Sequence, residues 1–229
     1  MREAMASQPA LLRELVADGE PCRAAADRIR GRRVLVAGTG TSWHSANQGA
    51  WLLRAAGAEA WAVQAVDAAE HEPRPGAGDA LVLLTHRGTK RYTSAVLERA
   101  RADGAETVVI SGRGSPGADI ETSEPERSST FTASHLGALM RVAQIAIELG
   151  ADLGRLDHVP DAVEAVLDGP GPGVEPPARL LELTGAGPNQ WTAAEGALKI
   201  RETAYVAASG LAVEQYLHCL LYTSDAADE

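Results

Sequence analysis

The chain lacks several features that mark whole classes of protein. Aromatic residues make up only 4% of its 229 residues, and its only cysteines are Cys22 and Cys219. Two cysteines exclude a disulfide framework and a cysteine-based metal site. The net charge is −10 and lysine and arginine form no block, which argues against nucleic acid or an anionic membrane as a partner. Without a signal peptide or an apolar run long enough to span a bilayer, we expect a soluble cytoplasmic protein.

Alanine, glycine and valine are abundant instead, in short apolar runs that each end in a glycine-rich turn. These runs predict strands at 33–37, 80–84, 107–111 and 179–183. Helical segments alternate with these strands. One covers 42–56, one follows the strand at 80–84 and ends at 102, one covers 130–149, and one contains Glu195. Another helix is expected over 1–17. Alternating strands and helices are typical of α/β proteins with a doubly wound parallel sheet. Such sheets bind ligands at the carboxyl ends of their strands, where the glycine-rich turns lie.

The stretch from Glu195 to His218 reads EGALKIRETAYVAASGLAVEQYLH. At 3.6 residues per turn, Glu195, Lys199 and Glu202 fall on one helical face, opposite an alanine-rich face that can be buried. Spacing alone fits an ordinary solvated stripe, because Glu followed by Lys four residues later is a common surface pair. His218 closes a second helical segment expected to begin near Leu211, and a lone histidine is often structural.

EGALKIRET followed by His218 resembles the isomerase domains of the sugar isomerase (SIS) family, whose members typically read EGALKLKE and then reach a histidine at the same distance. The resemblance extends over nearly the whole chain up to His218. It implies a flavodoxin-like three-layer αβα fold with a second, similar subdomain that is truncated. It also implies that Glu202 is a proton-transferring base and His218 a ring-opening acid/base. Glu195 and Lys199 would support them.

Three loops in the first half are candidate ligand contacts. Gly40, Thr41 and Ser42 follow the first strand, where a helix N-terminus suits a phosphate; a plain N-cap by Thr41 or Ser42 is the alternative. The G-T-S order matches the phosphate turn of the family. After the next strand the family shows S-Q-S-G-E-T, and this chain has Thr85, His86, Arg87, Gly88, Thr89 and Lys90. Arg87 and Lys90 replace hydroxyl residues, so they can bind an anion by charge, unless this is only an exposed polar loop.

The third loop contains Ser129 and Thr130, which align with a ligand-contacting hydroxyl pair of the family. They can equally cap the helix expected to start there. The later turn GAGPNQ is glycine-rich, but in the family the corresponding turn forms part of the second subdomain and carries no chemistry.

The domain organisation follows from these segments. We expect a lead-in helix over 1–30, a first SIS subdomain over 31–153, a helix and Pro/Gly linker over 154–178, and the start of a second subdomain over 179–218. Residues 219–229 (CLLYTSDAADE) resemble a translated sequencing adapter and are left out of the fold prediction. The family continues Gly-Pro after the histidine, so we expect the natural protein to extend beyond His218. The glutamine-hydrolysing domain of glutamine-dependent relatives would precede Met1, and we expect it to be absent.

The predicted function is that of an aldose–ketose isomerase, or an aminotransferase- or deaminase-like enzyme, on a sugar phosphate or amino-sugar phosphate. Proton transfer through an enediol or enolamine needs a carboxylate and no metal or organic cofactor. The family resemblance implies a homodimer, with His218 reaching the site of a neighbouring subunit. The alternative is a non-catalytic sugar-phosphate sensor, a role that needs neither Glu202 nor His218.

Overall fold

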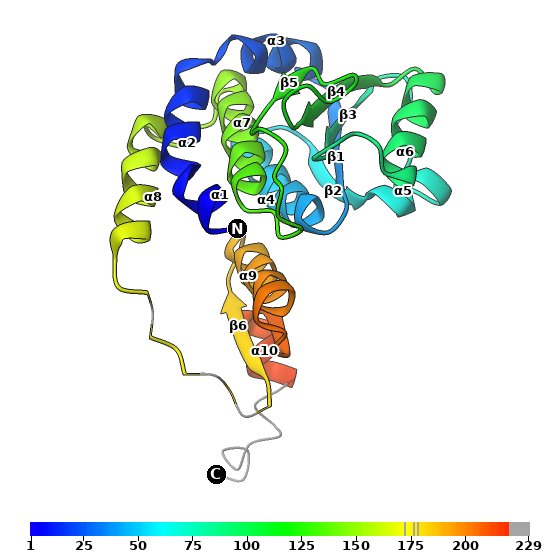
Figure 1. The fold of residues 1–229 in the computed structure, drawn as a ribbon. Helices are drawn as coiled ribbons and strands as arrows, with labels where there is room; N and C mark the ends of the chain where they lie inside the picture. Colours follow the sequence, from blue (N-terminus) through cyan, green and yellow to red (C-terminus); the bar gives the residue numbers. More distant parts are fainter. Residues whose placement is uncertain (172, 176, 178, 220–229) are drawn as a thin grey trace. The chain divides into compact units, whose positions relative to one another are not determined.

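The computed structural model describes residues 1–171, 173–175, 177 and 179–219, so the predicted adapter segment lies almost wholly outside it. The chain divides into two compact units, Met1–Gly171 and Pro172–Glu229, and Figure 1 shows their ribbons. Among the described residues, no helix is long and apolar enough to cross a membrane.

The first unit alternates strands and helices along most of its length. Its elements are α1 (Arg2–Ala6), α2 (Gln8–Ala17), α3 (Glu20–Ile29), β1 (Arg33–Gly38), α4 (Thr41–Ala55), β2 (Ala60–Gln64), α5 (Ala65–Glu70), β3 (Asp79–Leu84), α6 (Arg91–Ala102), β4 (Glu106–Ser111), β5 (Ile120–Glu121), α7 (Ala133–Leu149), the 3₁₀ turn η1 (Leu156–His158) and α8 (Val159–Asp168).

The five strands form one parallel sheet in the order β2-β1-β3-β4-β5. One face of the sheet is covered by α3, α4 and α7 and the other by α5 and α6, which gives three layers. The predicted α/β fold with a doubly wound parallel sheet is therefore confirmed. The order reverses at β1, because the chain moves from β1 outward to β2 and then crosses back to β3. The carboxyl ends of β1 and β3 consequently flank the point where doubly wound sheets bind ligands.

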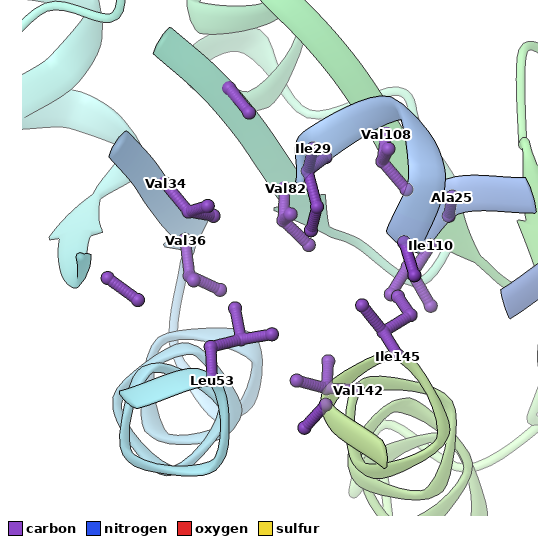
Figure 2. Packing of buried hydrophobic residues seen from close by; sticks show 14 of the residues in the cluster. Ala25, Ile29, Val34, Val36, Leu53, Val82, Val108, Ile110, Val142 and Ile145 are labelled. Carbon is purple, nitrogen blue, oxygen red and sulfur yellow. The ribbon is translucent and has the colours of Figure 1, made fainter. Parts of the chain in front are cut away.

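The larger core lies between the sheet and the helices α3, α4 and α7. In Figure 2, Val34, Val36 and Val82 project from the strands towards Leu53 of α4 and Val142 of α7. The central strands are buried on both faces, which explains their continuous apolar sequences. Each fully buried side chain of this size contributes about 1.5–3 kcal/mol, so this core fixes the strand ends that carry the candidate loops.

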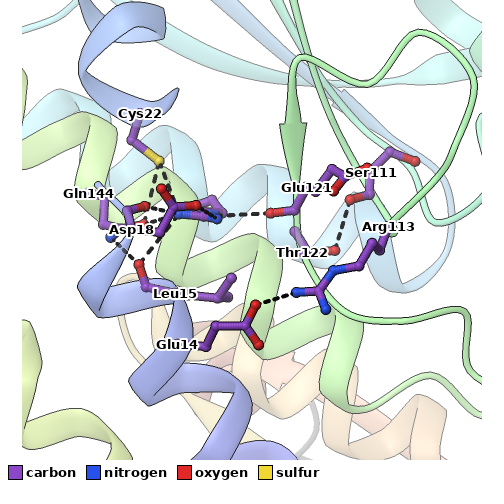
Figure 3. A network of polar contacts seen from close by, with 10 residues as sticks. Glu14, Leu15, Asp18, Cys22, Ser111, Arg113, Glu121, Thr122 and Gln144 are labelled. Atoms are coloured by element: carbon purple, nitrogen blue, oxygen red, sulfur yellow. Dashed lines mark hydrogen bonds and ion pairs between the residues drawn. The ribbon is translucent and has the colours of Figure 1, made fainter. Parts of the chain in front are cut away.

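The N-terminal helices are fastened to α7 by a buried arginine. The guanidinium of Arg141 donates to the main-chain oxygens of Glu121 (3.0 Å) and Asp18 and to the Gln144 amide oxygen (3.2 Å). Figure 3 shows the partners of this network. Cys22 lies inside it, and burial raises the pKa of its thiol to about 11, so this cysteine is a packing group with no nucleophilic character at neutral pH.

Several sequence predictions need correction in this unit. The single helix expected over 1–17 is two helices separated at Ser7, because Pro9 lies in the first turn of α2 and lacks the N–H needed to continue a helix through it. The helix expected from Thr130 begins at Ala133. The elements α3, β2, α5 and β5 were not predicted. In β2, at the edge of the sheet, only Ala60 and Val63 are buried, and β5 has two residues.

The second unit contains β6 (Leu181–Gly185), α9 (Asn189–Ala204), β7 (Ala208–Ala212) and α10 (Val213–Cys219). β6 and β7 pair in parallel, and α9 connects them. Gly210 of β7 allows this packing, since a Cβ there would come within 2.4 Å of the Ala194 backbone. The helix expected from Leu211 begins at Val213 instead, because Leu211 belongs to β7.

Candidate functional site

The turn between β1 and α4 places backbone at the switch point of the sheet. Gly38 ends β1, and a Cβ at this position would lie 2.2 Å from the main-chain oxygen of Ser42. Gly40 has φ +60°, which favours glycine, and its carbonyl oxygen accepts from the N–H of Trp43 at 2.8 Å. The two glycines therefore turn the chain sharply from a buried strand into a helix whose N-terminus faces the carboxyl edge of the sheet.

Thr41 and Ser42 lie in the first turn of α4, half-buried. The N-cap residue is Gly40, and no side chain caps this helix, so the alternative in which Thr41 or Ser42 is the N-cap is wrong. The N-terminus of a helix carries partial positive charge. In this turn the N–H groups of Ser42 and Trp43 donate to the main-chain oxygens of Thr39 (3.2 Å) and Gly40 (2.8 Å). Such a turn can accept an oxyanion, and the hydroxyl groups of Thr41 and Ser42 are side chains of that same turn.

The loop after β3 carries the cations predicted to replace hydroxyl groups. Arg87 and Lys90 are both exposed, and Lys90 is the N-cap residue of α6. Arg87 Nη2 approaches the main-chain oxygen of Glu126 at 3.5 Å, and the Thr85 hydroxyl accepts from the N–H of Gly88 at 3.3 Å. This loop is an exposed, positively charged segment at the edge of the sheet where ligands bind.

His86 is turned away from solvent and joins two loops. Its Nε2 accepts a hydrogen bond from the N–H of Glu126 at 3.1 Å, and its ring lies 4.6 Å from that of Phe131. Burial lowers the pKa of His86, which favours the neutral ring with its proton on Nδ1. That Nδ1 is buried and has no hydrogen-bond partner among the described residues. The structure therefore places this predicted substrate contact in a bracing position between the loops.

The third loop is organised by Glu126, which sequence reasoning missed. Its buried carboxylate accepts from the N–H groups of Thr132 (3.0 Å) and Ser134 (2.9 Å) and from the Ser134 hydroxyl (2.7 Å). These bonds cap α7, whose N-cap residue Thr132 makes no side-chain cap of its own. The alternative in which Ser129 or Thr130 caps this helix is therefore wrong. Ser129 is exposed and Thr130 is buried, with its N–H bonded to the Ser128 hydroxyl at 3.1 Å.

In the second unit, the predicted Glu-Lys-Glu row forms along α9. Lys199 Nζ lies 3.2 Å from the Glu195 carboxylate and 2.7 Å from the Glu202 carboxylate. Exposure of these side chains rises along the row, from 8% for Glu195 to 19% for Lys199 and 33% for Glu202. The row is not an open stripe opposite the buried face, as the spacing suggested, because Glu195 is as buried as Ala193. A carboxylate with this little exposure needs a cation beside it, and Lys199 supplies one.

His218 lies on α10 and is exposed. Among the described contacts within this unit, none joins His218 to Lys199 or to either carboxylate of the row. Within the first unit, the structure thus joins the loop after β3 to the loop before α7, through Arg87 and His86 against Glu126. Within the second unit, it joins the row on α9. No group of histidine, cysteine, aspartate and glutamate side chains that could hold a metal ion occurs among the described residues.

Comparisons with known proteins agree with this architecture. Residues 29–136 match the family model of the SIS domain. Glutamine–fructose-6-phosphate aminotransferase (isomerizing) of Pyrococcus horikoshii is 29% identical over 208 residues, which is 81% of this chain and 35% of that protein. The chain thus spans about a third of the length of this curated relative.

Solved structures match over nearly the whole chain. The tagatose-6-phosphate ketose/aldose isomerase of Escherichia coli has a TM-score of 0.78 at 22% identity, covering 97% of this chain and 69% of its own. The glucosamine-6-phosphate deaminase of Thermotoga maritima has a TM-score of 0.71 at 15% identity, covering 97% of this chain and 72% of its own. At these identities the likeness shows the fold.

Proposed function

We propose that this chain, which carries an SIS domain over residues 29–136, acts on a sugar phosphate or amino-sugar phosphate and moves a carbonyl group between C1 and C2. The observation that carries the proposal is the Glu195–Lys199–Glu202 row, since it joins two carboxylates and a cation on the helix whose sequence resembles that of the sugar isomerases. The reaction would be an aldose–ketose isomerisation, or the related amination or deamination of the sugar. The aminotransferase relative and the isomerase and deaminase structures support this range.

Binding is assigned to the first unit. The phosphate would be held by the α4 N-terminus at Gly40, Thr41 and Ser42, with Arg87 and Lys90 supplying positive charge. Charge-assisted hydrogen bonds to a phosphate are roughly twice as strong as neutral ones. The exposed Ser129 and the buried Thr130 are assigned to the sugar hydroxyl groups because both lie in the third loop.

Chemistry is assigned to the second unit. Glu202, the more exposed carboxylate of the row, would take the proton from C2 of the open-chain aldose and return it to C1 through an enediol. Lys199 beside it would stabilise negative charge that develops on the substrate oxygens, and the buried Glu195 would hold Lys199 in place. His218 would open the sugar ring by proton transfer. No metal or organic cofactor takes part in this scheme, and we propose that the active form is a homodimer in the cytoplasm.

The second candidate is a sugar-phosphate sensor without catalysis. It is favoured by the 2.7 Å contact between Lys199 and Glu202, because this carboxylate is already held by an ion pair within the helix. In a sensor, the same row would only donate and accept hydrogen bonds to the sugar.

Solvent exchange separates the two candidates. In D₂O, the protein should place deuterium on the proton-transfer carbon of fructose 6-phosphate or of glucosamine 6-phosphate. Glu202→Gln keeps the shape and removes the basic oxygen, so exchange should fall about 10²–10⁴-fold while substrate affinity stays within about tenfold. Glu175→Gln, at an exposed position of the linker, is the matched control and should leave exchange unchanged. Exchange in Glu202→Gln at the parent rate would remove the base assignment, and no exchange in the parent would favour the sensor.

A further inference from the structure

A serine–histidine pair joins the second turn of α4 to the first turn of α7. Ser45 Oγ lies 2.7 Å from His135 Nδ1, and Ser45 also donates to the main-chain oxygen of Thr41 at 3.1 Å. Ser45 is almost completely buried, with 1% of its surface exposed. The hydrogen bond to His135 therefore forms in a site that excludes water from the serine.

The protons of this pair can be placed by counting donors. A hydroxyl group has one proton, and the Ser45 proton is directed at the Thr41 carbonyl oxygen. Both contacts are hydrogen bonds at once only in the tautomer in which His135 Nδ1 donates to Ser45 Oγ across the 2.7 Å contact, and we take this tautomer. The result is a chain of two hydrogen bonds from the imidazole through the hydroxyl group to the Thr41 carbonyl.

The two helices meet closely enough for this chain to set a position. α4 and α7 pack side by side on the same face of the sheet (Figure 1). Gly49 of α4 permits the approach, since a Cβ there would lie 3.1 Å from Val142 of α7. Packing at Gly49 and Val142 fixes the distance between α4 and α7 in their middle. The His135–Ser45 bond fixes that distance near their N-terminal ends, at the carboxyl edge of the sheet.

We propose that His135 is a positioning residue that sets the first turn of α4 for anion binding, acting through Ser45 on the Thr41 carbonyl. This inference rests on the proposed function only in taking the Gly40–Ser42 turn as the anion site. Donors that are already in place need no reorganisation when an anion arrives, so a fixed turn binds more tightly than a mobile one. His135 reaches the anion through α4 and need not touch it.

Two substitutions at His135 separate positioning from packing. His135→Leu fills much of the ring volume without a donor. His135→Asn is smaller and places an amide N–H₂ near the position of Nδ1, so it can still donate to Ser45. We expect His135→Leu to weaken fructose 6-phosphate binding, measured by calorimetry on the full chain, by about tenfold, and His135→Asn to stay within about twofold of the parent. Ser45→Ala should match His135→Leu, and the double variant should be no weaker than either single one, because both break the same chain of bonds.

A ligand-free measurement decides the claim independently. Amide hydrogen exchange across residues 38–46 should be faster in His135→Leu and Ser45→Ala than in the parent, and near parental in His135→Asn. His71→Ala, at an exposed histidine of the same unit, should change nothing. Equal behaviour of His135→Leu and His135→Asn, or additive effects of the two sites, would overturn the proposal. If the parent binds no fructose 6-phosphate while the exchange pattern holds, the proposed function fails and the positioning of the turn stands.

Discussion

The β1–α4 turn and the β6–α9 turn have the same backbone and different side chains. Gly38 and Gly185 each end a strand, and a Cβ at either would come within 2.2 Å or 2.1 Å of the main-chain oxygen four residues later. Gly40 and Gly187 both have positive φ, at +60° and +55°. The N–H to C=O bonds that close the turns also correspond, from Ser42 to Thr39 (3.2 Å) and from Asn189 to Ala186 (3.0 Å).

The side chains of the two turns differ in the hydrogen-bond donors they offer. The second turn has Pro188 at the position of Thr41. Thr41 has an N–H and a hydroxyl group that can donate hydrogen bonds, and Pro188 has neither. The first turn also follows β1, which pairs with β3, and the loop after β3 carries Arg87 and Lys90. The second turn leads into a helix whose charged groups lie along its body. The same backbone turn thus precedes the proposed anion site in the first unit and the Glu-Lys-Glu row in the second. Shared geometry at a glycine-rich turn is therefore a poor guide to function without the donors.

The first way to test the comparison is to disturb the shared backbone. Gly38→Ala forces a Cβ against the Ser42 main chain, which cannot move without unwinding α4, so we expect a loss of about 3 kcal/mol in the free energy of unfolding. Gly185→Ala should disorder the second unit in the same way, seen as faster amide exchange in α9. Gly76→Ala is the control, because no atom lies within 4 Å of its added Cβ. A stable Gly38→Ala protein, by urea unfolding, would show that the turns are not as tight as described.

The second test converts one turn into the other. Thr41→Pro gives the first turn the residue that the second has at Pro188, after a glycine of nearly the same φ. Proline is accepted in a first helical turn, so stability should change little while one anion donor is lost. We expect sugar-phosphate affinity to fall by about 1.5–3 kcal/mol, whereas Thr41→Val, which keeps the N–H, should lose less. Equal affinities of the Thr41→Pro and Thr41→Val variants by calorimetry would show that the N–H of residue 41 does not bind the anion.

The third test removes the charge beside the first turn. Arg87 is exposed, so its contribution falls at the low end for a charge-assisted bond, and Arg87→Ala should weaken sugar-phosphate binding by about 1.4 kcal/mol, or tenfold. The loss should shrink at high salt, because exposed charges are screened. Arg74→Ala, at an exposed arginine between α5 and β3, is the control. An unchanged affinity would show that the Arg87 side chain contacts solvent and not the sugar phosphate.

The smallest effect concerns the brace beneath the charged loop. The folded protein lowers the pKa of His86, so the unfolded chain binds a proton more readily near pH 6. The stabilising contribution of His86 is therefore complete above its unfolded pKa of about 6.5 and is lost as the pH falls through the lower folded value. Unfolding free energies measured from pH 8 to pH 5 should fall less steeply in His86→Asn than in the parent. If the unfolding free energies of His86→Asn and of the parent fall equally between pH 8 and pH 5, protonation of His86 does not affect stability.

Much of this arrangement could be predicted from the sequence, for identifiable physical reasons. Strands such as Val34–Ala37 are buried on both faces, and the unbroken apolar run predicts them directly. The Glu195–Lys199–Glu202 row follows from helical spacing alone. The edge strand β2 escaped prediction because only half of its residues are buried, and the break at Ser7 was hidden by an apolar pattern that continues through both helices.

The site residues found only in the structure share one property, that they act across loops. Glu126 caps a helix that begins several residues later, and the serine and threonine residues directly before that helix drew the capping prediction instead. His135 and Ser45 lie far apart in the sequence and meet because α4 and α7 pack on the same face of the sheet. Sequence patterns report neighbours along one element, whereas these contacts depend on where two elements meet.

The most direct test of the central claim is to titrate fructose 6-phosphate into the isotopically labelled chain and follow the amide signals of the two turns by NMR. We expect saturable shifts of the amides from Gly40 to Trp43 and no shifts of the amides at Gly187 and from Asn189 to Trp191; Pro188 has no amide proton. In Thr41→Pro the shifts that remain in the first turn should appear only at higher ligand concentration, in keeping with its weaker affinity. Matching shifts in both turns, or shifts in the second turn alone, would contradict the assignment of the anion site to the β1–α4 turn.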